Sequence, residues 1–247
     1  MTGPDHIVRL IILAGPSCAG KTPLIRAFRT HNPEEAARLQ QIVPYTTRFP
    51  RKGEIDGRDY HFVDNKAFSS LRTKASFIEI RVRGDRQAVD TGTIGEKLKK
   101  GPALYEGNTF LARELLIHAK RSDIPVRSVF LSPFRRSDLQ EFHDRYGSEA
   151  TRRHVYEIML AKLRKRAERK KFGAQEDIDQ RAREAFDELL VAGDFDFVIV
   201  NPLGEEDAVW DDPHRLRGSA DRVSRSFAEI VVSGYSDHAE KWPADLF

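Results

Sequence analysis

The chain has 247 residues, of which 40% are hydrophobic and 32% are charged, and this balance excludes a disordered chain or a membrane-embedded one. Its 41 basic side chains nearly offset 38 acidic ones, so the net charge of +3 gives no overall attraction to nucleic acid or to membranes. The single cysteine, Cys18, excludes an internal disulfide, and the apolar run near the N-terminus is too short for a signal peptide or a membrane span. We therefore expect a globular protein in the reducing cytoplasm.

The first informative segment is a strand, a loop and a helix. Residues 7–14 (IVRLIILA) are almost continuously apolar, which predicts a central parallel strand, and a helical pattern begins near Thr22. Between them, residues 15–22 (GPSCAGKT) fit G-x-x-x-x-G-K-[ST], a loop whose backbone N–H groups wrap phosphates. In such a loop Lys21 reaches the β- and γ-phosphate oxygens, and the Thr22 hydroxyl can ligate Mg²⁺. The predicted ATP-binding residues are Gly15, Ser17, Cys18, Ala19, Gly20, Lys21 and Thr22. The alternative is a chance Gly-rich turn.

The next segment, residues 42–63, is irregular and rich in Pro, Gly and Arg. Two arginines, Arg48 and Arg51, lie three residues apart in it, and each guanidinium offers a planar fork of donors that suits a phosphate. Tyr60 supplies one more donor. The pattern indicates a phosphate clamp, although a solvated basic loop has the same composition.

Strands and helices alternate over the rest of the chain. Strands are predicted at 77–84, 103–107, 126–133 and 195–201, with helices near 65–73, 110–120 and 219–232. A Gly/Thr turn is expected at 91–95, and the tail after residue 233 has no periodic signal and is expected to be loosely held. This alternation predicts a doubly wound α/β protein with a parallel sheet.

A basic helical segment interrupts this alternation. Residues 134–190 are helical and charged in pattern, and residues 152–171 hold nine Lys or Arg. The apolar Val155, Met159 and Leu163 recur at helical spacing, so an amphipathic helix with a basic face is predicted. That face could be solvated, bind nucleic acid or serve a phosphate site.

The segment from Thr46 to Val63 closely resembles the guanylate kinase family. The family reads T-T-R-x-P-R-x-G-E-x-x-G-x-D-Y-x-F-V here, and this chain matches every fixed position. The resemblance implies that Arg48, Arg51 and Tyr60 hold the phosphate of an acceptor nucleotide.

Farther on, Phe77-Ile78-Glu79 is similar to the family's F-[IL]-E strand, whose glutamate recognises guanine. One carboxylate can accept from the N1–H and N2–H₂ groups of guanine together, which adenine cannot offer. An edge-of-sheet carboxylate is the alternative for Glu79. Thr93, in a Gly-Thr pair that resembles a family turn, is assigned to the same acceptor site.

The resemblance spans about residues 8–201 and extends to a lid over the donor phosphates. It implies that Arg166 and Arg181 are lid arginines that act in catalysis with Lys21. Residues 134–160 are then an insertion that compact family members lack, either a longer lid or a dimer contact.

Three departures from the family pattern concern the acceptor base and the metal. Pro44 replaces a serine that contacts guanine, and Thr91 replaces a tyrosine. Glu106 stands near the place of an aspartate at the end of a strand, displaced by one residue, and we expect it to hold Mg²⁺ through water. The reaction class is therefore better supported than the acceptor.

Together these features predict a three-layer α/β P-loop kinase core with a parallel sheet, a small acceptor-binding subdomain and a helical lid. We expect one domain over 1–247, with a core at 5–41, 96–133 and 191–232, the acceptor-binding subdomain at 42–95, the lid and insertion at 134–190 and a tail at 233–247. The expected function is Mg²⁺- and ATP-dependent phosphoryl transfer to a nucleoside monophosphate, GMP first. A related kinase of another nucleotide or a sugar phosphate, and a non-catalytic protein-interaction module, are the alternatives. We expect no membrane or nucleic-acid partner, and the oligomeric state stays open.

Overall fold

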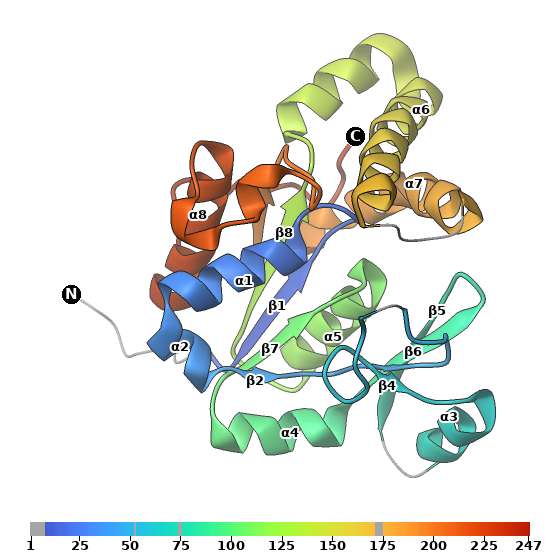
Figure 1. Ribbon diagram of the computed structural model, residues 1–247, viewed down its shortest axis with the longest axis vertical. Helices are drawn as coiled ribbons and strands as arrows, with labels where there is room; N and C mark the ends of the chain where they lie inside the picture. The colour runs from blue at the N-terminus through green and yellow to red at the C-terminus, as the bar shows by residue number, and fades with distance from the viewer. Residues whose placement is uncertain (1–7, 52, 74–75, 171–174) are drawn as a thin grey trace. The chain divides into compact units, whose positions relative to one another are not determined.

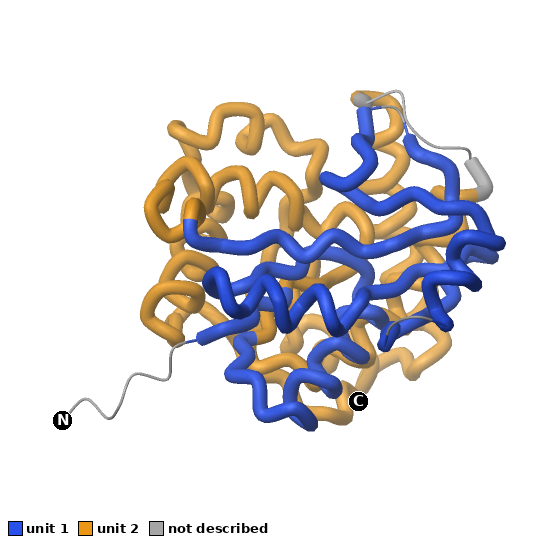
Figure 2. The backbone as a smooth tube through the Cα atoms, turned by 90° about the horizontal axis from the view of Figure 1, so that it is seen from below, with its two compact units in different colours: residues 1–12, 38–127 blue, residues 13–37, 128–247 orange. Residues whose placement is uncertain are grey.

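The computed structural model describes residues 8–51, 53–73, 76–170 and 175–247 of the chain. Some predictions fall outside these residues: Ile7 of the first strand, Lys52 of the clamp segment, Lys171 of the basic run and the side chain of Lys170. The chain forms two compact units, residues 1–12 with 38–127 and residues 13–37 with 128–247 (Figure 2). The finer division that we derived from the sequence stays a prediction.

The helices and strands are shown in Figure 1. The strands are β1 (Leu10–Ala14), β2 (Gln40–Gln41), β3 (Tyr45–Thr46), β4 (His61–Phe62), β5 (Phe77–Val82), β6 (Asp85–Asp90), β7 (Ala103–Glu106), β8 (Val126–Ser132) and β9 (Phe197–Val200). The α-helices are α1 (Lys21–His31), α2 (Pro33–Arg38), α3 (Asn65–Arg72), α4 (Thr91–Lys100), α5 (Thr109–Arg121), α6 (Arg136–Lys170), α7 (Gln175–Leu190) and α8 (Ser219–Ser233). Short 3₁₀ helices are η1 (Ala192–Asp194), η2 (Ala208–Trp210) and η3 (Pro213–Arg215).

The main sheet has five parallel strands in the order β2-β7-β1-β8-β9. All five residues of β1 are buried, as a strand that is covered on both faces requires. The jump in the strand order from β1 to β8 is possible because parallel neighbours are joined by long crossover connections. The α/β class with a parallel sheet is thereby confirmed.

A second sheet of four strands, in the order β4-β3-β6-β5, carries the predicted clamp segment. Its β5 and β6 form an antiparallel hairpin, whereas the sequence analysis recognised only one strand, at 77–84. Arg83 and Gly84 connect the two strands with φ of 50° and 85°. A two-residue hairpin turn needs this left-handed backbone, and glycine at its second position provides it.

The Gly/Thr turn expected at 91–95 is instead the first turn of helix α4. The carboxylate of Asp90 caps this helix by accepting hydrogen bonds from the backbone N–H groups of Gly92 and Thr93. An Asp at the N-cap stabilises a helix start even when a glycine follows, and this outweighed the turn signal.

The helical region that begins near residue 134 consists of α6 and α7, which pack against each other. α6 bends at Gly147, whose φ of 80° and ψ of 173° are not helical. Its apolar face is buried at Val155, Met159 and Leu163, so the predicted amphipathic helix is confirmed. Over the described residues, no helix has both the length and the apolar character that a membrane crossing requires.

The tail after residue 233 is not loosely held, contrary to the prediction. Glu240 pairs with Val198 of β9 through two backbone hydrogen bonds of 2.7 and 2.8 Å. Trp242 is 1% exposed, and Leu246 is also buried. The tail was misread because two buried side chains in an irregular segment give no periodic pattern.

Candidate active site

The predicted phosphate-binding loop follows β1 and leads into α1, which is the placement that its sequence pattern predicts. Two of its glycines are required by close approaches. A Cβ atom on Gly15 would lie 2.3 Å from the backbone oxygen of Leu131, and one on Gly20 would lie 2.5 Å from Nδ2 of Asn201. Both also have positive φ, 140° and 95°. Asn201, which follows β9, donates from Nδ2 to the backbone oxygen of Ala19 at 2.8 Å and so holds the loop against the sheet.

Lys21 is the first residue of α1, and its side chain bends back over the loop. Its Nζ atom donates to the backbone oxygens of Gly15 at 2.6 Å and Pro16 at 2.9 Å. In the described structure no side chain caps α1 at Gly20, and the N-terminus of a helix is a typical place for an anion to bind. The exposed Thr22 lies in the same turn. Backbone donors, one ammonium and one hydroxyl are thus assembled at the start of this helix.

Both predicted lid arginines lie against this loop, within the unit that contains it. Arg166 of α6 places Nη1 3.8 Å from Sγ of Cys18, and Arg181 of α7 donates from Nη1 to Oγ of Ser17 at 3.1 Å. Their side chains are 20% and 7% exposed. The loop therefore has three cations around it, Lys21 among them.

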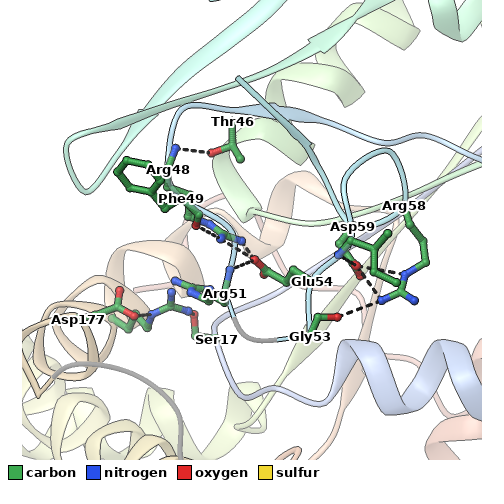
Figure 3. A network of polar contacts seen from close by, with 12 residues as sticks. Ser17, Thr46, Arg48, Phe49, Arg51, Gly53, Glu54, Arg58, Asp59 and Asp177 are labelled. Atoms are coloured by element: carbon green, nitrogen blue, oxygen red, sulfur yellow. Dashed lines mark hydrogen bonds and ion pairs between the residues drawn. The ribbon is translucent and has the colours of Figure 1, made fainter. Parts of the chain in front are cut away.

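Each of these arginines is paired with a carboxylate that the sequence analysis missed. Nη2 of Arg166 lies 2.9 Å from Oε2 of Glu205, whose side chain is 6% exposed. Nε of Arg181 lies 2.9 Å from Oδ2 of Asp177, which Figure 3 shows near Ser17. Burial tends to lower the pKa of Arg166, but the negative charge of Glu205 and smaller contributions from Cys18 and Glu206 together raise that pKa. The arginine therefore stays charged.

Cys18 is a packing residue of the loop. Burial raises the pKa of its thiol to about 11, with Arg166 opposing and Glu205 reinforcing the shift. The thiol is therefore neutral near pH 7 and lacks the thiolate form in which cysteines react.

The predicted phosphate clamp lies in the other unit and is held together by Glu54. Nη1 and Nη2 of Arg48 each donate to one oxygen of the Glu54 carboxylate at 2.6 Å (Figure 3). The backbone N–H of Arg51 donates to the same carboxylate at 2.7 Å. The Arg48 guanidinium also stacks 4.8 Å above the ring of Tyr60. Three predicted acceptor-binding residues are thereby brought together.

Tyr60 is influenced electrostatically both by the clamp and by Glu106 at the end of β7. Burial raises the pKa of Tyr60, the positive charge of Arg48 opposes this shift, and the negative charge of Glu106 adds to it. Glu106 therefore lies within electrostatic reach of the clamp. Among the described residues no three His, Cys, Asp or Glu side chains form a metal-binding group.

Glu79, the predicted base reader, lies on β5 with its carboxylate bound by an arginine that sequence reasoning missed. Arg86 donates from Nε to Oε1 at 2.8 Å and from Nη2 to Oε2 at 3.2 Å. Arg72 is farther away, 3.8 Å from Oε2. The hydrogen bonds from Arg86, against a smaller effect of burial, lower the pKa of Glu79. Recognising the β5–β6 hairpin in the sequence would have predicted this pair, because Glu79 and Arg86 are diagonal neighbours on one face of the hairpin.

Thr93 is occupied within its own helix. Its hydroxyl donates to Oδ2 of Asp90 at 3.0 Å, and its backbone N–H is bound to the same side chain. Its assignment to the acceptor site stays a prediction.

Comparisons with known proteins agree with this geometry. The sequence model of the family described as guanylate kinase matches residues 7–162. A guanylate kinase of Thiobacillus denitrificans is 34% identical over 200 residues, which cover 81% of this chain and 85% of that protein. One of Mycobacterium bovis is 29% identical over 204 residues, covering 80% and 82%. The crystal structure of guanylate kinase from Anaplasma phagocytophilum has the same fold, with a TM-score of 0.52 at 19% identity over 94% of this chain and 89% of that one.

Proposed function

This chain belongs to the guanylate kinase family, and from that premise we propose that it transfers the γ-phosphoryl group of ATP to GMP, giving ADP and GDP. The observation that carries the proposal is the arrangement of Lys21, Arg166 and Arg181 around the phosphate-binding loop. Phosphoryl transfer needs little covalent chemistry from a protein, because positioned cations that offset charge on the transferred group supply most of the acceleration.

In this proposal the donor phosphates bind the N–H groups of the Gly15–Thr22 loop, and Lys21 exchanges its two carbonyl acceptors for phosphate oxygens. Arg166 and Arg181 offset the charge that develops during transfer. The acceptor phosphate binds Arg48, Arg51 and Tyr60, whose shared contacts to Glu54 and to one another fix their geometry before the substrate arrives.

The proposal also includes Mg²⁺ as the counterion of the ATP phosphates. The exposed Thr22 hydroxyl in the first turn of α1 suits one direct ligand position, and we assign Glu106 a contact through water. When bound, the ion neutralises charge on the donor phosphates and orients them. The single cysteine is in keeping with a reducing, cytoplasmic compartment.

One observation favours a second acceptor class within the same reaction. Both oxygens of Glu79 are already bound by Arg86, and Pro44 has no side-chain donor, so base selection need not follow the family. A kinase of another phosphorylated small molecule is therefore the runner-up. A non-catalytic interaction module is less well supported, because Lys21 and Thr22 of the phosphate-binding loop are both present.

The test is ATP consumption against a panel of nucleoside monophosphates and sugar phosphates. We expect GMP among the best acceptors and, for Lys21→Ala, the loss of nearly all turnover with an unchanged melting temperature. Lys66→Ala, on α3, is the matched control and should retain full activity. Near-native turnover by Lys21→Ala would refute the assigned role of this loop, and turnover of a sugar phosphate alone would establish the runner-up.

A further inference from the structure

Glu79 and Arg86 form a fixed ion pair that is held by further contacts of the arginine. All three guanidinium nitrogens of Arg86 have a partner: Nε and Nη2 donate to Glu79, and Nη1 donates to Oγ of Ser69 at 3.0 Å. The guanidinium also lies 4.3 Å from the ring centroid of Phe68 on α3. The side chains of Arg86 and Glu79 are only 14% and 20% exposed, so the pair is held in place but is not sealed from a ligand.

The pair is also fixed to the phosphate clamp through the backbone. The N–H of Thr47 donates to the backbone oxygen of Arg86 at 3.0 Å, and the N–H of Arg86 donates to Oγ1 of Thr47 at 2.9 Å. Thr47 immediately precedes Arg48 of the clamp. A nucleotide whose phosphate is bound by the clamp therefore has the pair at a fixed place relative to that phosphate.

Within the described part of the chain, the hydrogen-bonding groups of the pair that take part in no hydrogen bond form a mixed array. Nη2 of Arg86 carries two N–H groups, of which one donates to Oε2 of Glu79, and Oε2 has a second lone pair. One donor and one acceptor thus remain side by side. Because Oε1 and Oε2 each already accept from Arg86, the carboxylate is less able to accept from two base donors at once.

From this arrangement we propose that Arg86 is a specificity-determining residue, which donates to the 6-oxo group of the acceptor base while Glu79 accepts from N1–H. This inference rests on the proposed function and narrows its substrate class to 6-oxopurine monophosphates, guanine and hypoxanthine alike. The 2-amino group that distinguishes guanine from hypoxanthine is not read. Adenine presents the reversed order, a donor at position 6 and an acceptor at N1. Its 6-amino donor would therefore face the Arg86 donor, and its N1 acceptor would face the Glu79 acceptor.

The first test compares kcat/KM for three acceptors, GMP, IMP and AMP, with the wild-type protein. This test does not depend on whether a variant folds. We expect kcat/KM for IMP to lie within about tenfold of that for GMP, since a group that the site does not bind contributes little discrimination. AMP should be poorer than both by at least about a hundredfold, because two hydrogen bonds are replaced by two unpaired polar contacts. A preference for GMP over IMP above about a thousandfold would overturn the proposal, because the 2-amino group would then be read.

Arg86→Leu provides the second test, with Arg72→Gln as its matched control. Removing Arg86 deletes the donor to the 6-oxo group and frees Glu79 to accept from N1–H and the 2-amino group together. The ratio of kcat/KM for GMP over IMP should then rise by about tenfold or more, and Arg72→Gln should leave it unchanged. An unchanged ratio in Arg86→Leu that melts like wild type would reject the assignment. Failure of the proposed function looks different, because wild-type protein would then turn over neither GMP nor IMP.

Discussion

At the scale of single residues, two of the arginines in the proposed site are each held by a carboxylate. Arg48 is bound by Glu54, and Arg166 by Glu205. A guanidinium on a long flexible side chain loses conformational entropy when it binds a phosphate, and a fixed carboxylate partner removes much of that loss in advance. We therefore include these carboxylates in the proposed site, although they would repel a phosphate themselves.

The clamp gives a prediction at this scale. Arg48→Ala and Arg51→Ala should each raise the KM for GMP by about tenfold or more, because each removes hydrogen bonds to a charged group worth roughly 1.5–3 kcal/mol. The KM for ATP should stay the same in steady-state assays that vary each substrate separately. Arg58→Ala is the control from the same loop, since its side chain is 60% exposed and pairs with Asp59. An equal rise of both KM values would point to a structural role for the loop.

The residues that the sequence predicted and those that it missed differ in one physical respect. The phosphate-binding loop and the clamp are local motifs whose members lie within about twenty residues of one another, so their spacing shows their geometry. Arg166 and Glu205 are 39 positions apart, and nothing near Glu205 marks it as a partner rather than one of many solvated carboxylates. Arg86 was missed for a smaller reason, because the β5–β6 hairpin was not recognised.

At the scale of elements, the basic run on α6 has a defined partner. Lys162, Arg166 and Arg169 recur at four- and three-residue spacing and therefore share one helix face. Lys162 donates to the backbone oxygen of Pro202, and Arg169 donates to that of Glu206 and pairs with Asp211. The segment from Pro202 to Asp211 thus lies along this face of α6 within one unit. Sequence analysis predicted the helix and its basic face, but not the segment that covers part of it.

Glu205 supplies the prediction that belongs to this scale. Glu205→Gln should lower kcat about tenfold, because Arg166 remains but its guanidinium is no longer held in position. The loss of a charge-stabilising donor itself lowers kcat by more, roughly 10²–10³-fold. The KM for GMP should not change, and initial-rate kinetics at saturating ATP separate the two constants.

Asp211→Asn is the matched control, since it breaks an ion pair of the same helix face, one turn farther on, without approaching the phosphate-binding loop. A rise in the KM for GMP with kcat intact, or an equal loss of activity in the control, would contradict the proposed role of Glu205 in positioning Arg166.

At the scale of the whole molecule, the C-terminal tail is part of the core. Trp242 is 1% exposed, and its Nε1 donates to Glu240, which also pairs with β9. Trp242→Ala should therefore lower the free energy of unfolding by about 3–5 kcal/mol, as expected for a large aromatic side chain removed from a core. Tyr235→Ala, in the same tail but 64% exposed, should change it by less than about 0.5 kcal/mol. Urea unfolding of both variants measures these changes in the free energy of unfolding. Equally small changes in the two variants would show that Trp242 is not part of the core.

The buried thiol of Cys18 has a practical consequence for following this protein in motion. Because burial raises the pKa of this thiol to about 11, it is almost entirely neutral at pH 7, and we expect maleimide reagents to react with it slowly. Because it is the chain's single cysteine, a cysteine introduced at the exposed Phe49 or Tyr235 would be labelled alone, without first removing the native one. Since these positions belong to different units, a pair of dyes attached there would test by energy transfer whether the distance between the units changes when nucleotides bind.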